Sequence, residues 1–430
     1  MARRHSEEVD RMASARHGRL RRSSGWLNAG RVLLTAVLVM ALSGASVVAY
    51  AAWGLWSDVK TVDLNPDTPD AVGAGSEAVD GPLTILLVGS DSREGQSLDD
   101  GETGELNDVN LLLHVSADHQ NATVISFPRD LMLPIPSCPG PNGEPDYFPA
   151  MSEQQLNSTL SEGGLPCVAR TLQELTGLDI PYAGLITFDG VIAMSNAIGG
   201  VDVCLTQPIE DPMTGLSLPA GDNTLVGGDA LQFLRTRYGV GNGGDTSRIS
   251  NQQVFMSSMV RQLRSADTLG NPAKVYSLAK AGVENMTLSS NMADVSFMQR
   301  VASTVKDIDL ERINFVQYPT QTHPYQAGRL TPDSEAGDLL MEIIASGQAF
   351  EVTATGEGVQ AEGQDPAAPP TEGETPPTEG ETPPTEGEAP PTEGETPPTE
   401  GASDGPVQLP PGVTGQSAAN QTCSAGRTVF

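Results

Sequence analysis

The chain of 430 residues is long enough for one or two folded domains with additional segments. Its net charge of −31 is unevenly spread, because residues 1–31 hold eight Arg and three acidic side chains while the remainder carries −36. Such an acidic body excludes non-specific binding to nucleic acid, so an anionic ligand would need a local basic pocket.

The N-terminal region predicts a membrane anchor. Residues 1–31 are rich in Arg and lack apolar periodicity, which indicates a disordered basic tail. An uncharged run of 22 residues follows from Val32 to Trp53, long enough to cross a bilayer core. Aromatic residues typical of the membrane interface stand at Tyr50, Trp53 and Trp56. We therefore predict a transmembrane helix over 32–56 with a cytoplasmic N-terminus; a cleaved signal peptide is the alternative.

Alternating strand and helix patterns predict an α/β body over residues 82–350, after an acidic stalk over 57–81. The run Leu83–Val88 is typical of a strand buried on both faces. Further strands are expected at 110–116, 123–127, 182–188, 201–205 and 313–318. Helices are expected near 152–162, 167–176, 189–197, 247–265, 272–282, 291–305 and 335–345. This alternation predicts a mixed central sheet flanked by helices, in α-β-α layers.

The C-terminal region has a different composition. From Pro369 a seven-residue repeat based on Pro-Pro-Thr-Glu-Gly-Glu-Thr starts five times, with its ending changed in the third and fifth copies, and it has no apolar seam. We predict a disordered spacer with polyproline character over 351–405, followed by a C-terminal segment over 406–430.

Four cysteines fit two disulfides in an exported body, and the sequence permits three pairings. We choose Cys138–Cys167 and Cys204–Cys423 as a working hypothesis; four buried thiols are the alternative. Because no CxxC motif is present and His is rare, a zinc site is not expected.

A basic cluster lies between Gly228 and Gln253. Arg235, Arg237 and Arg248 fall within fourteen positions of this acidic chain, which suggests an anion with several charges, such as a pyrophosphate. Arg248 and Gln252 are four apart after a predicted helix start, so they should share one helix face. Surface salt bridges are the alternative interpretation.

Two carboxylates, Asp91 and Asp108, are expected near the ends of neighbouring strands. Paired Asp oxygens together with a phosphate ligand are typical of an Mg²⁺ or Mn²⁺ site. Arg93 and Arg129 could complete a pocket that stabilises charge on phosphorus. Turn or capping roles are the alternative for each Asp. The chain has no P-loop and no serine-hydrolase motif.

Five motifs in order resemble the LytR-CpsA-Psr family of envelope proteins. They are Leu87-Val-Gly-Ser-Asp-Ser-Arg93, Ser126-Phe-Pro-Arg-Asp130, Phe188-Asp-Gly with Gly199-Gly-Val-Asp-Val203, Leu234-Arg-Thr-Arg-Tyr238, and Asp245 to Gln253. The resemblance implies transfer of a phospho-glycan from a polyprenyl-pyrophosphate carrier to a hydroxyl of peptidoglycan, or of a protein, outside the bacterial cell membrane. It implies Asp91 and Asp108 as metal-linked residues, Asp91, Arg93, Arg129, Arg235 and Arg237 as catalytic, and Arg248 and Gln252 as pyrophosphate-binding.

Two departures from the family pattern bear on the site. Asp108 lies in Leu106-Asn-Asp-Val109, where the family often has Arg-Ser-Asp-Thr. Gln155 stands where the family often has Lys, so one basic contact is missing. Two further hypotheses therefore stay open: hydrolysis of the carrier without an acceptor, and isoprenoid binding without catalysis.

Overall fold

The computed structural model describes residues 25–57, 59–64, 79–93, 96–97, 104–140, 144, 146–265, 268, 271–361 and 407–427. The chain forms two compact units, Met1–Ser57 and Asp58–Phe430. In the first unit, helix α1 (Gly25–Ser57) begins inside the range predicted as a disordered tail. Over the described residues, no helix has the length and apolar character needed to cross a membrane. Anchoring through residues 32–56 thus stays a prediction.

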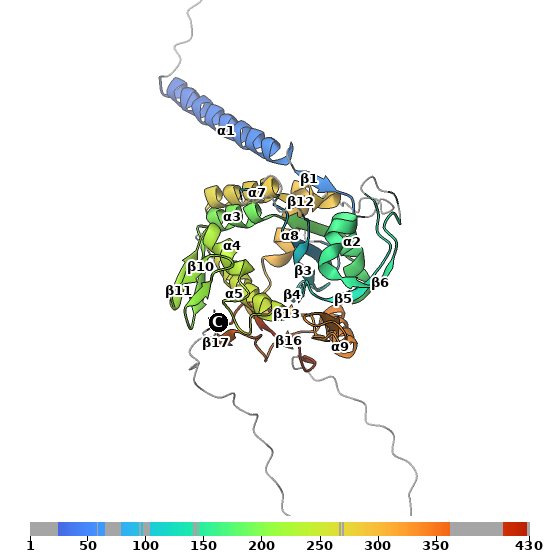
Figure 1. The fold of residues 1–430 in the computed structure, drawn as a ribbon. Helices are drawn as coiled ribbons and strands as arrows, with labels where there is room; N and C mark the ends of the chain where they lie inside the picture. The colour runs from blue at the N-terminus through green and yellow to red at the C-terminus, as the bar shows by residue number, and fades with distance from the viewer. Residues whose placement is uncertain are drawn as a thin grey trace, which may run out of the picture. The chain divides into compact units, whose positions relative to one another are not determined.

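The second unit is built on an eight-stranded sheet, which confirms the predicted mixed α/β fold (Figure 1). Strands β2 and β3, and β3 and β4, pair antiparallel, whereas β7 beside β2 and β13 beside β4 are parallel. In sheet order the strands are β1 (Lys60–Val62), β12 (Met286–Ser289), β7 (Tyr182–Ile186), β2 (Leu83–Ser90), β3 (Asn107–Val115), β4 (Ala122–Phe127), β13 (Ile313–Gln317) and β19 (Gly415–Ser417).

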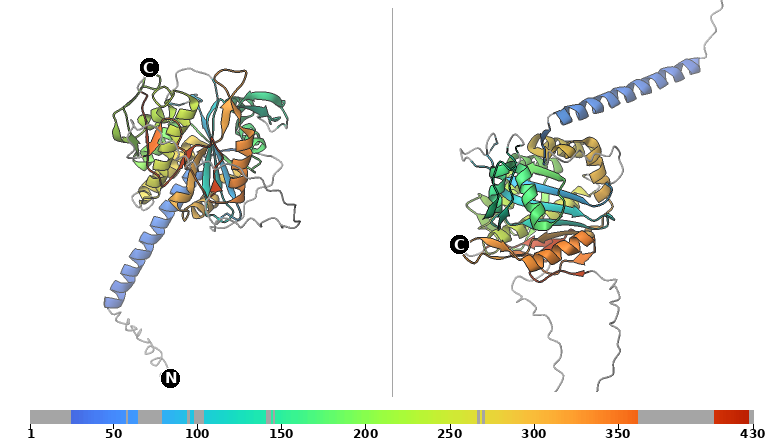
Figure 2. Two further views of the ribbon diagram at one scale, coloured as in Figure 1. Left: turned by 90° about the horizontal axis from the view of Figure 1, so that it is seen from below. Right: turned by 90° about the vertical axis from the view of Figure 1, so that its right-hand side faces the viewer.

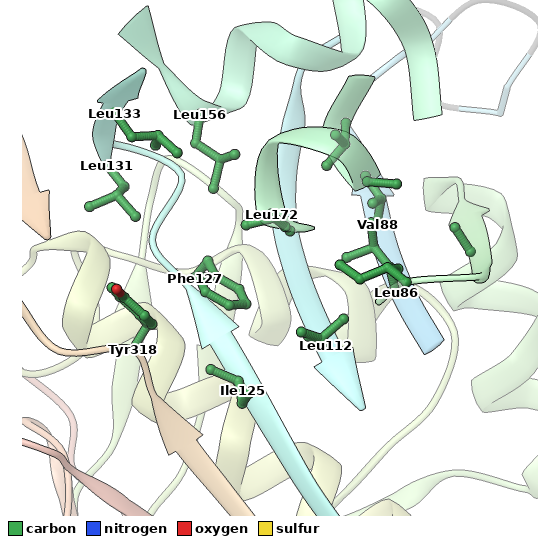
Figure 3. Packing of buried hydrophobic residues seen from close by; sticks show 14 of the residues in the cluster. Leu86, Val88, Leu112, Ile125, Phe127, Leu131, Leu133, Leu156, Leu172 and Tyr318 are labelled. Atoms are coloured by element: carbon green, nitrogen blue, oxygen red, sulfur yellow. The ribbon is translucent and has the colours of Figure 1, made fainter. Parts of the chain in front are cut away.

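Helices lie on both faces of this sheet (Figure 2). Alternate strand residues face opposite layers. Leu86 and Val88 of β2 pack in the core under α2 (Thr159–Thr176) and α9 (Ser334–Ser346). Figure 3 shows these two residues in the core, close to Leu172 of α2. On the other face are α3 (Phe188–Ile198), α4 (Gly228–Arg235), α5 (Asp245–Leu263) and α8 (Val295–Val305), with α7 (Pro272–Asn285) beside α3.

A second, four-stranded sheet joins distant parts of the chain. Its order is β11 (Gly221–Leu225), β8 (Val201–Leu205), β20 (Thr422–Ser424) and β17 (Val359–Ala361). The disulfide Cys204–Cys423 links neighbouring β8 and β20, and Cys138–Cys167 ties the loop after β5 (Met132–Ile135) to α2. Both pairings chosen from the sequence are confirmed.

Several predicted boundaries differ from the structure. The helix expected at 152–162 is wrong in its first part: Met151–Gln155 forms strand β6, because it pairs with β5. Its second part is helical, with a short 3-10 helix over Leu156–Ser158 and α2 from Thr159. β1 lies inside the predicted stalk, and β17 lies inside the predicted spacer. These short segments were misassigned because their partner strands, β12 and β20, are far away in sequence. The repeats themselves fall outside the described residues.

Small strand pairs complete the body. β9 (Ile209–Asp211) pairs with β10 (Leu216–Leu218), and β16 (Phe350–Glu351) pairs with β18 (Val407–Gln408). β14 (Thr320–Thr322) and β15 (Leu330–Pro332) form a hairpin whose β15 strand lies beside β5, near the ends of the central strands.

Candidate active site

An apolar cavity lies between the sheet and helices α3, α4 and α5; together with the open solvent at its mouth it occupies about 1040 Å³. Its walls come from β2, β3 and β7 on the sheet side, and from apolar residues of the three helices, including Val191, Met194, Leu231, Phe255 and Met259. The polar side chains that line it include Asp108, Arg235, Arg248 and Gln252. The cavity thus combines an apolar body with a charged patch, which suits an amphiphilic ligand with an anionic group.

The first turn of α5 supplies a buried ion pair. Asp245 and Arg248 are one turn apart and both side chains are 5% exposed; Arg248 Nη2 lies 2.5 Å from Asp245 Oδ1. Arg248 also donates to the carbonyl of Asp108 at 2.9 Å. Burial lowers the pKa of Arg248, while Asp245 and Asp108 act in the opposite direction. Gln252, one turn later, donates to the carbonyl of Leu234 and so ties α5 to α4. The predicted shared face of Arg248 and Gln252 is confirmed.

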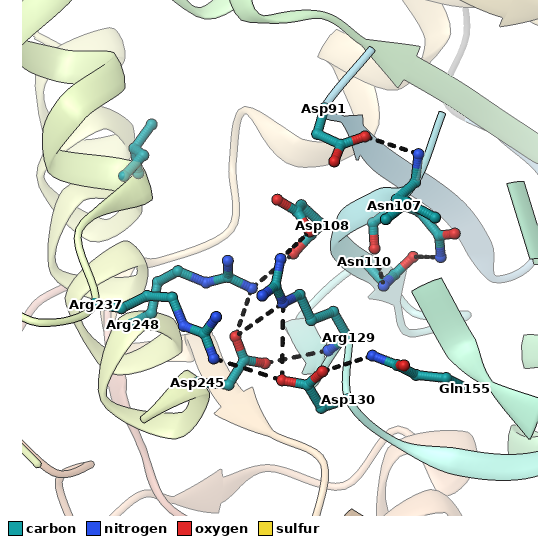
Figure 4. Close-up of polar contacts among 12 residues, drawn as sticks. Asp91, Asn107, Asp108, Asn110, Arg129, Asp130, Gln155, Arg237, Asp245 and Arg248 are labelled. Atoms are coloured by element: carbon teal, nitrogen blue, oxygen red, sulfur yellow. Dashed lines mark hydrogen bonds and ion pairs between the residues drawn. The ribbon is translucent and has the colours of Figure 1, made fainter. Parts of the chain in front are cut away.

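Arg129 contacts both Asp108 of β3 and Asp245 of α5 (Figure 4). Its guanidinium bonds Asp108, and its backbone N–H donates to Asp245 Oδ2 at 3.2 Å. Burial lowers the pKa of Arg129, but the charges of Asp108, Asp245 and Asp130 outweigh it, so the pKa is raised. Arg129 therefore stays fully charged although it is largely enclosed.

Asp91 lies close enough to Asp108 for the two charges to interact. Burial raises the pKa of Asp91 and the negative charge of Asp108 adds to this, although a hydrogen bond from the backbone N–H of Leu106 opposes the shift. Arg93 acts electrostatically on both Asp91 and Arg235, which places it in the same cluster. The structure thus brings the two predicted carboxylates together.

Arg235 and Arg237 leave the end of α4 in different directions. Arg235 lies over the ring of Phe188, 4.5 Å from its centroid; burial, then Arg93, lowers its pKa. Arg237 does not line the cavity and instead reaches toward Asp130, with 3.6 Å between Nη2 and Oδ2. The turn between them is held by buried Asp211, which accepts from the Thr236 hydroxyl and the Arg237 N–H.

Sequence reasoning missed the acids and one further arginine of the cluster. Asp130 and Asp245 hold the predicted arginines in place, and Arg329 Nη1 bonds Asp130 Oδ1 at 2.7 Å. Asp130 follows Arg129 directly, and Asp245 stands three residues before Arg248, so their spacing offered a local signal. Arg329 lies far along the chain and offered none.

The part of the chain that the structure describes has no group of three or more His, Cys, Asp or Glu residues able to hold a metal ion. The donor set at Asp91 and Asp108 is two carboxylates, one of them bonded to Arg129. Mg²⁺ is commonly bound by one or two carboxylates with waters and ligand phosphates, so this pair fits such an ion when a phosphate is also present.

The LytR_cpsA_psr family model matches residues 54–336, which is more than half of the chain. The chain belongs to the LytR_cpsA_psr family. The match covers every residue of the cluster described above.

Relatives in this family include the cell wall biosynthesis protein LcpA of Corynebacterium glutamicum, 31% identical over 62% of this chain and 55% of that protein. The polyisoprenyl-teichoic acid–peptidoglycan teichoic acid transferase TagV of Bacillus subtilis is 24% identical over 65% of this chain and 70% of that protein. The chain thus spans about half of the length of LcpA. A solved structure, protein gbs0355 of Streptococcus agalactiae, has the same fold, with a TM-score of 0.50 at 21% identity over 62% of this chain and 88% of that one.

Proposed function

We propose that this LytR_cpsA_psr protein transfers a phospho-glycan from a polyprenyl-pyrophosphate carrier to a hydroxyl of a cell-wall acceptor. The observation that carries the proposal is the apolar cavity with Arg235, Arg248 and Gln252 among its polar lining. An isoprenoid tail would occupy the apolar part and the pyrophosphate would meet the arginines. The names of LcpA and TagV, a cell wall biosynthesis protein and a teichoic acid transferase to peptidoglycan, support this assignment.

The charge of the cluster supports an anionic ligand. Its arginines outnumber its acids, even when buried Asp211 beside Arg237 is counted. A pyrophosphate diester carries two negative charges. The members are Arg93, Arg129, Arg235, Arg237, Arg248 and Arg329, with Asp91, Asp108, Asp130 and Asp245. Because most of these groups are at least half-buried, their interaction with an anion is only weakly screened by salt.

The transfer step follows from this placement. The acceptor oxygen forms a bond to the sugar-proximal phosphorus, and the bond from that phosphorus to the bridging oxygen breaks, so polyprenyl phosphate leaves. The proton of the acceptor hydroxyl needs a base, and Asp91 is our candidate because it is a carboxylate that interacts with Asp108 of the cavity wall. Arg235 and Arg248 hold the charge that develops on the leaving phosphate. A bound Mg²⁺ or Mn²⁺, held by Asp91 and Asp108, would withdraw charge from the phosphate oxygens.

We further propose that residues 32–56 anchor the protein in the bacterial cell membrane, with the N-terminus in the cytoplasm and the catalytic body outside. The uncharged run from Val32 to Trp53 and the basic residues before it support this orientation. A carrier with an isoprenoid tail is itself confined to the membrane, so anchoring would keep enzyme and substrate together.

The test is transfer of a labelled, lipid-linked glycan to purified wall fragments by the full chain. We expect Arg235→Ala to lower the rate by about 100-fold, the size of effect seen when one charge-stabilising donor is removed. Arg170→Ala is the matched control, because Arg170 is 38% exposed and bonds a loop near β5 rather than the cluster.

The same assay separates the alternatives. Release of free phospho-glycan while wall acceptor is present would indicate a hydrolase. Binding of the carrier without turnover, in the presence of divalent metal, would indicate a non-catalytic isoprenoid-binding protein. Normal transfer by the Arg235 variant would refute the assignment of the site.

A further inference from the structure

Asp130 is the shared partner of several cations. Its side chain is 10% exposed, and its two oxygens face different groups. Oδ1 accepts from Arg329 Nη1 at 2.7 Å and from Gln155 Nε2 at 2.5 Å. Oδ2 faces Arg129 Nε at 3.7 Å and Arg237 Nη2 at 3.6 Å, both beyond hydrogen-bond distance. The strong bonds of Asp130 therefore go to Arg329 and Gln155.

Arg129 and Arg237 consequently keep donor capacity within the protein. The Nε atoms of both are buried and have no hydrogen-bond partner in the described structure. Buried donors of this kind are rarely left unpaired. Arg129 bonds Asp108 of the cavity wall, and Arg237 acts electrostatically on Arg248 of that wall, so an anion at the wall can draw on both guanidiniums. Without another cation beside it, Asp130 would compete with a ligand for the guanidiniums of Arg129 and Arg237.

Arg329 is held at this position by its hairpin. The N–H of Leu330 donates to the Asp130 carbonyl at 3.2 Å, and the carbonyl of Arg329 accepts from the N–H of His323 at 2.9 Å. The buried ring of His323 lies 3.1 Å from Glu153 through Nε2, and its Nδ1 accepts from the N–H groups of Tyr325 and Gln326. These bonds fix the hairpin that presents Arg329, so the contact with Asp130 is built into the fold.

We propose that Arg329 is a positioning residue of the pyrophosphate site: it neutralises Asp130, so that the positive charge of Arg129 and Arg237 acts on the ligand rather than on Asp130. This proposal rests on the function proposed above. Gln155 bonds the same oxygen of Asp130 but is neutral, so Arg329 supplies from β14–β15 the charge that position 155 lacks.

The position of Arg329 is compatible with the proposed reaction. In that reaction the isoprenoid occupies the cavity, and the attacking and leaving oxygens stand roughly in line across the phosphorus. Arg329 does not line the cavity, and neither does Asp130, the carboxylate that it bonds. It can therefore tune these two guanidiniums without obstructing the lipid.

Because Arg329 and Gln155 bond the same oxygen, Asp130 Oδ1, the positive charge can be moved from position 329 to position 155 as a test. Arg329→Gln removes the charge, and Gln155→Lys in the same chain returns it to Asp130 Oδ1 from the neighbouring strand. Binding of farnesyl pyrophosphate to the full chain in detergent is measured by calorimetry. We expect Arg329→Gln to weaken binding about tenfold, and the double variant to bind within about threefold of the native chain. Arg170→Gln, with nearly equal exposure, should bind as the native chain does.

The hydrogen bonds of the hairpin are made by the backbone, so these variants change the charge beside Asp130 and leave those bonds in place. Arg329→Lys, which keeps the charge, should bind close to the native chain even if Arg329→Gln loses thermal stability. The proposal is overturned if Arg329→Gln binds like the native chain, or if the double variant binds no better than the single one. Equal binding by the native chain and Arg235→Ala would instead overturn the proposed function.

Discussion

Replacing Arg248 by methionine would test how much the buried ion pair of α5 contributes to stability. The substitution leaves Asp245 charged at 5% exposure, with Arg129 Nε 3.9 Å away and the Arg129 N–H as its remaining partners. Breaking a buried pair on one side costs about 3–5 kcal/mol, and the remaining contacts of Asp245 place this site near the lower value. A loss of about 3 kcal/mol lowers the midpoint of thermal unfolding by roughly 5 °C in a body of this size.

The measurement is thermal and urea unfolding of the oxidised chain, followed by circular dichroism. Adding Asp245→Asn to Arg248→Met removes the stranded charge while the amide oxygen still accepts from Arg129, so the double variant should regain more than half of the lost stability. Both variants should fail to bind farnesyl pyrophosphate, because the guanidinium at the cavity is absent from each. A loss below about 1 kcal/mol, or a double variant no more stable than the single one, would refute the reasoning.

Three further changes test other parts of the site. Met194→Trp fills the cavity and should weaken binding of farnesyl pyrophosphate at least tenfold, while inorganic pyrophosphate, which needs no cavity, binds unchanged; calorimetry compares the two ligands. The pKa of Asp91 is raised in the folded protein, so ionised Asp91 destabilises the fold as pH rises above the pKa of the unfolded state. With a chelator present, Asp91→Asn should therefore raise the thermal unfolding midpoint at pH 7 and leave it unchanged near pH 3. Replacing Cys204 and Cys423 by alanine should lower the unfolding free energy by about 2–5 kcal/mol in urea, and an unchanged midpoint would show that this link is dispensable.

The sequence predicted the parts of the site that lie in local patterns. Arg248 and Gln252 could be placed on one face because helical spacing fixes their direction. Asp91 and Asp108 could be expected to meet because β2 and β3 are consecutive strands that pair directly. In each case a short stretch of chain, or one hairpin, determines the geometry.

The parts that were missed depend on pairings across long stretches of sequence. Arg329 reaches Asp130 across 199 positions, and only the pairing of Leu330 with Leu131 brings it there. β17 and β20 were missed because three-residue strands carry too little pattern to be recognised without their partners. β6 was mistaken for a helix for the same reason, since its pairing with β5 decides its conformation.

Residues 407–427, which follow the repeats, support the site through helix α5. α5 presents Arg248 and Gln252 to the cavity on one face, and on the other it bonds the C-terminal strands: Ser424 donates to Asn251 at 2.7 Å, and Gln416 to Ser257 at 3.0 Å. Asn251 in turn donates to the carbonyl of Phe233 in α4, so one buried amide connects β20, α5 and α4. Because both arginine-bearing helices rest on this amide, the position of the pyrophosphate site depends on residues about 170 positions later in the chain.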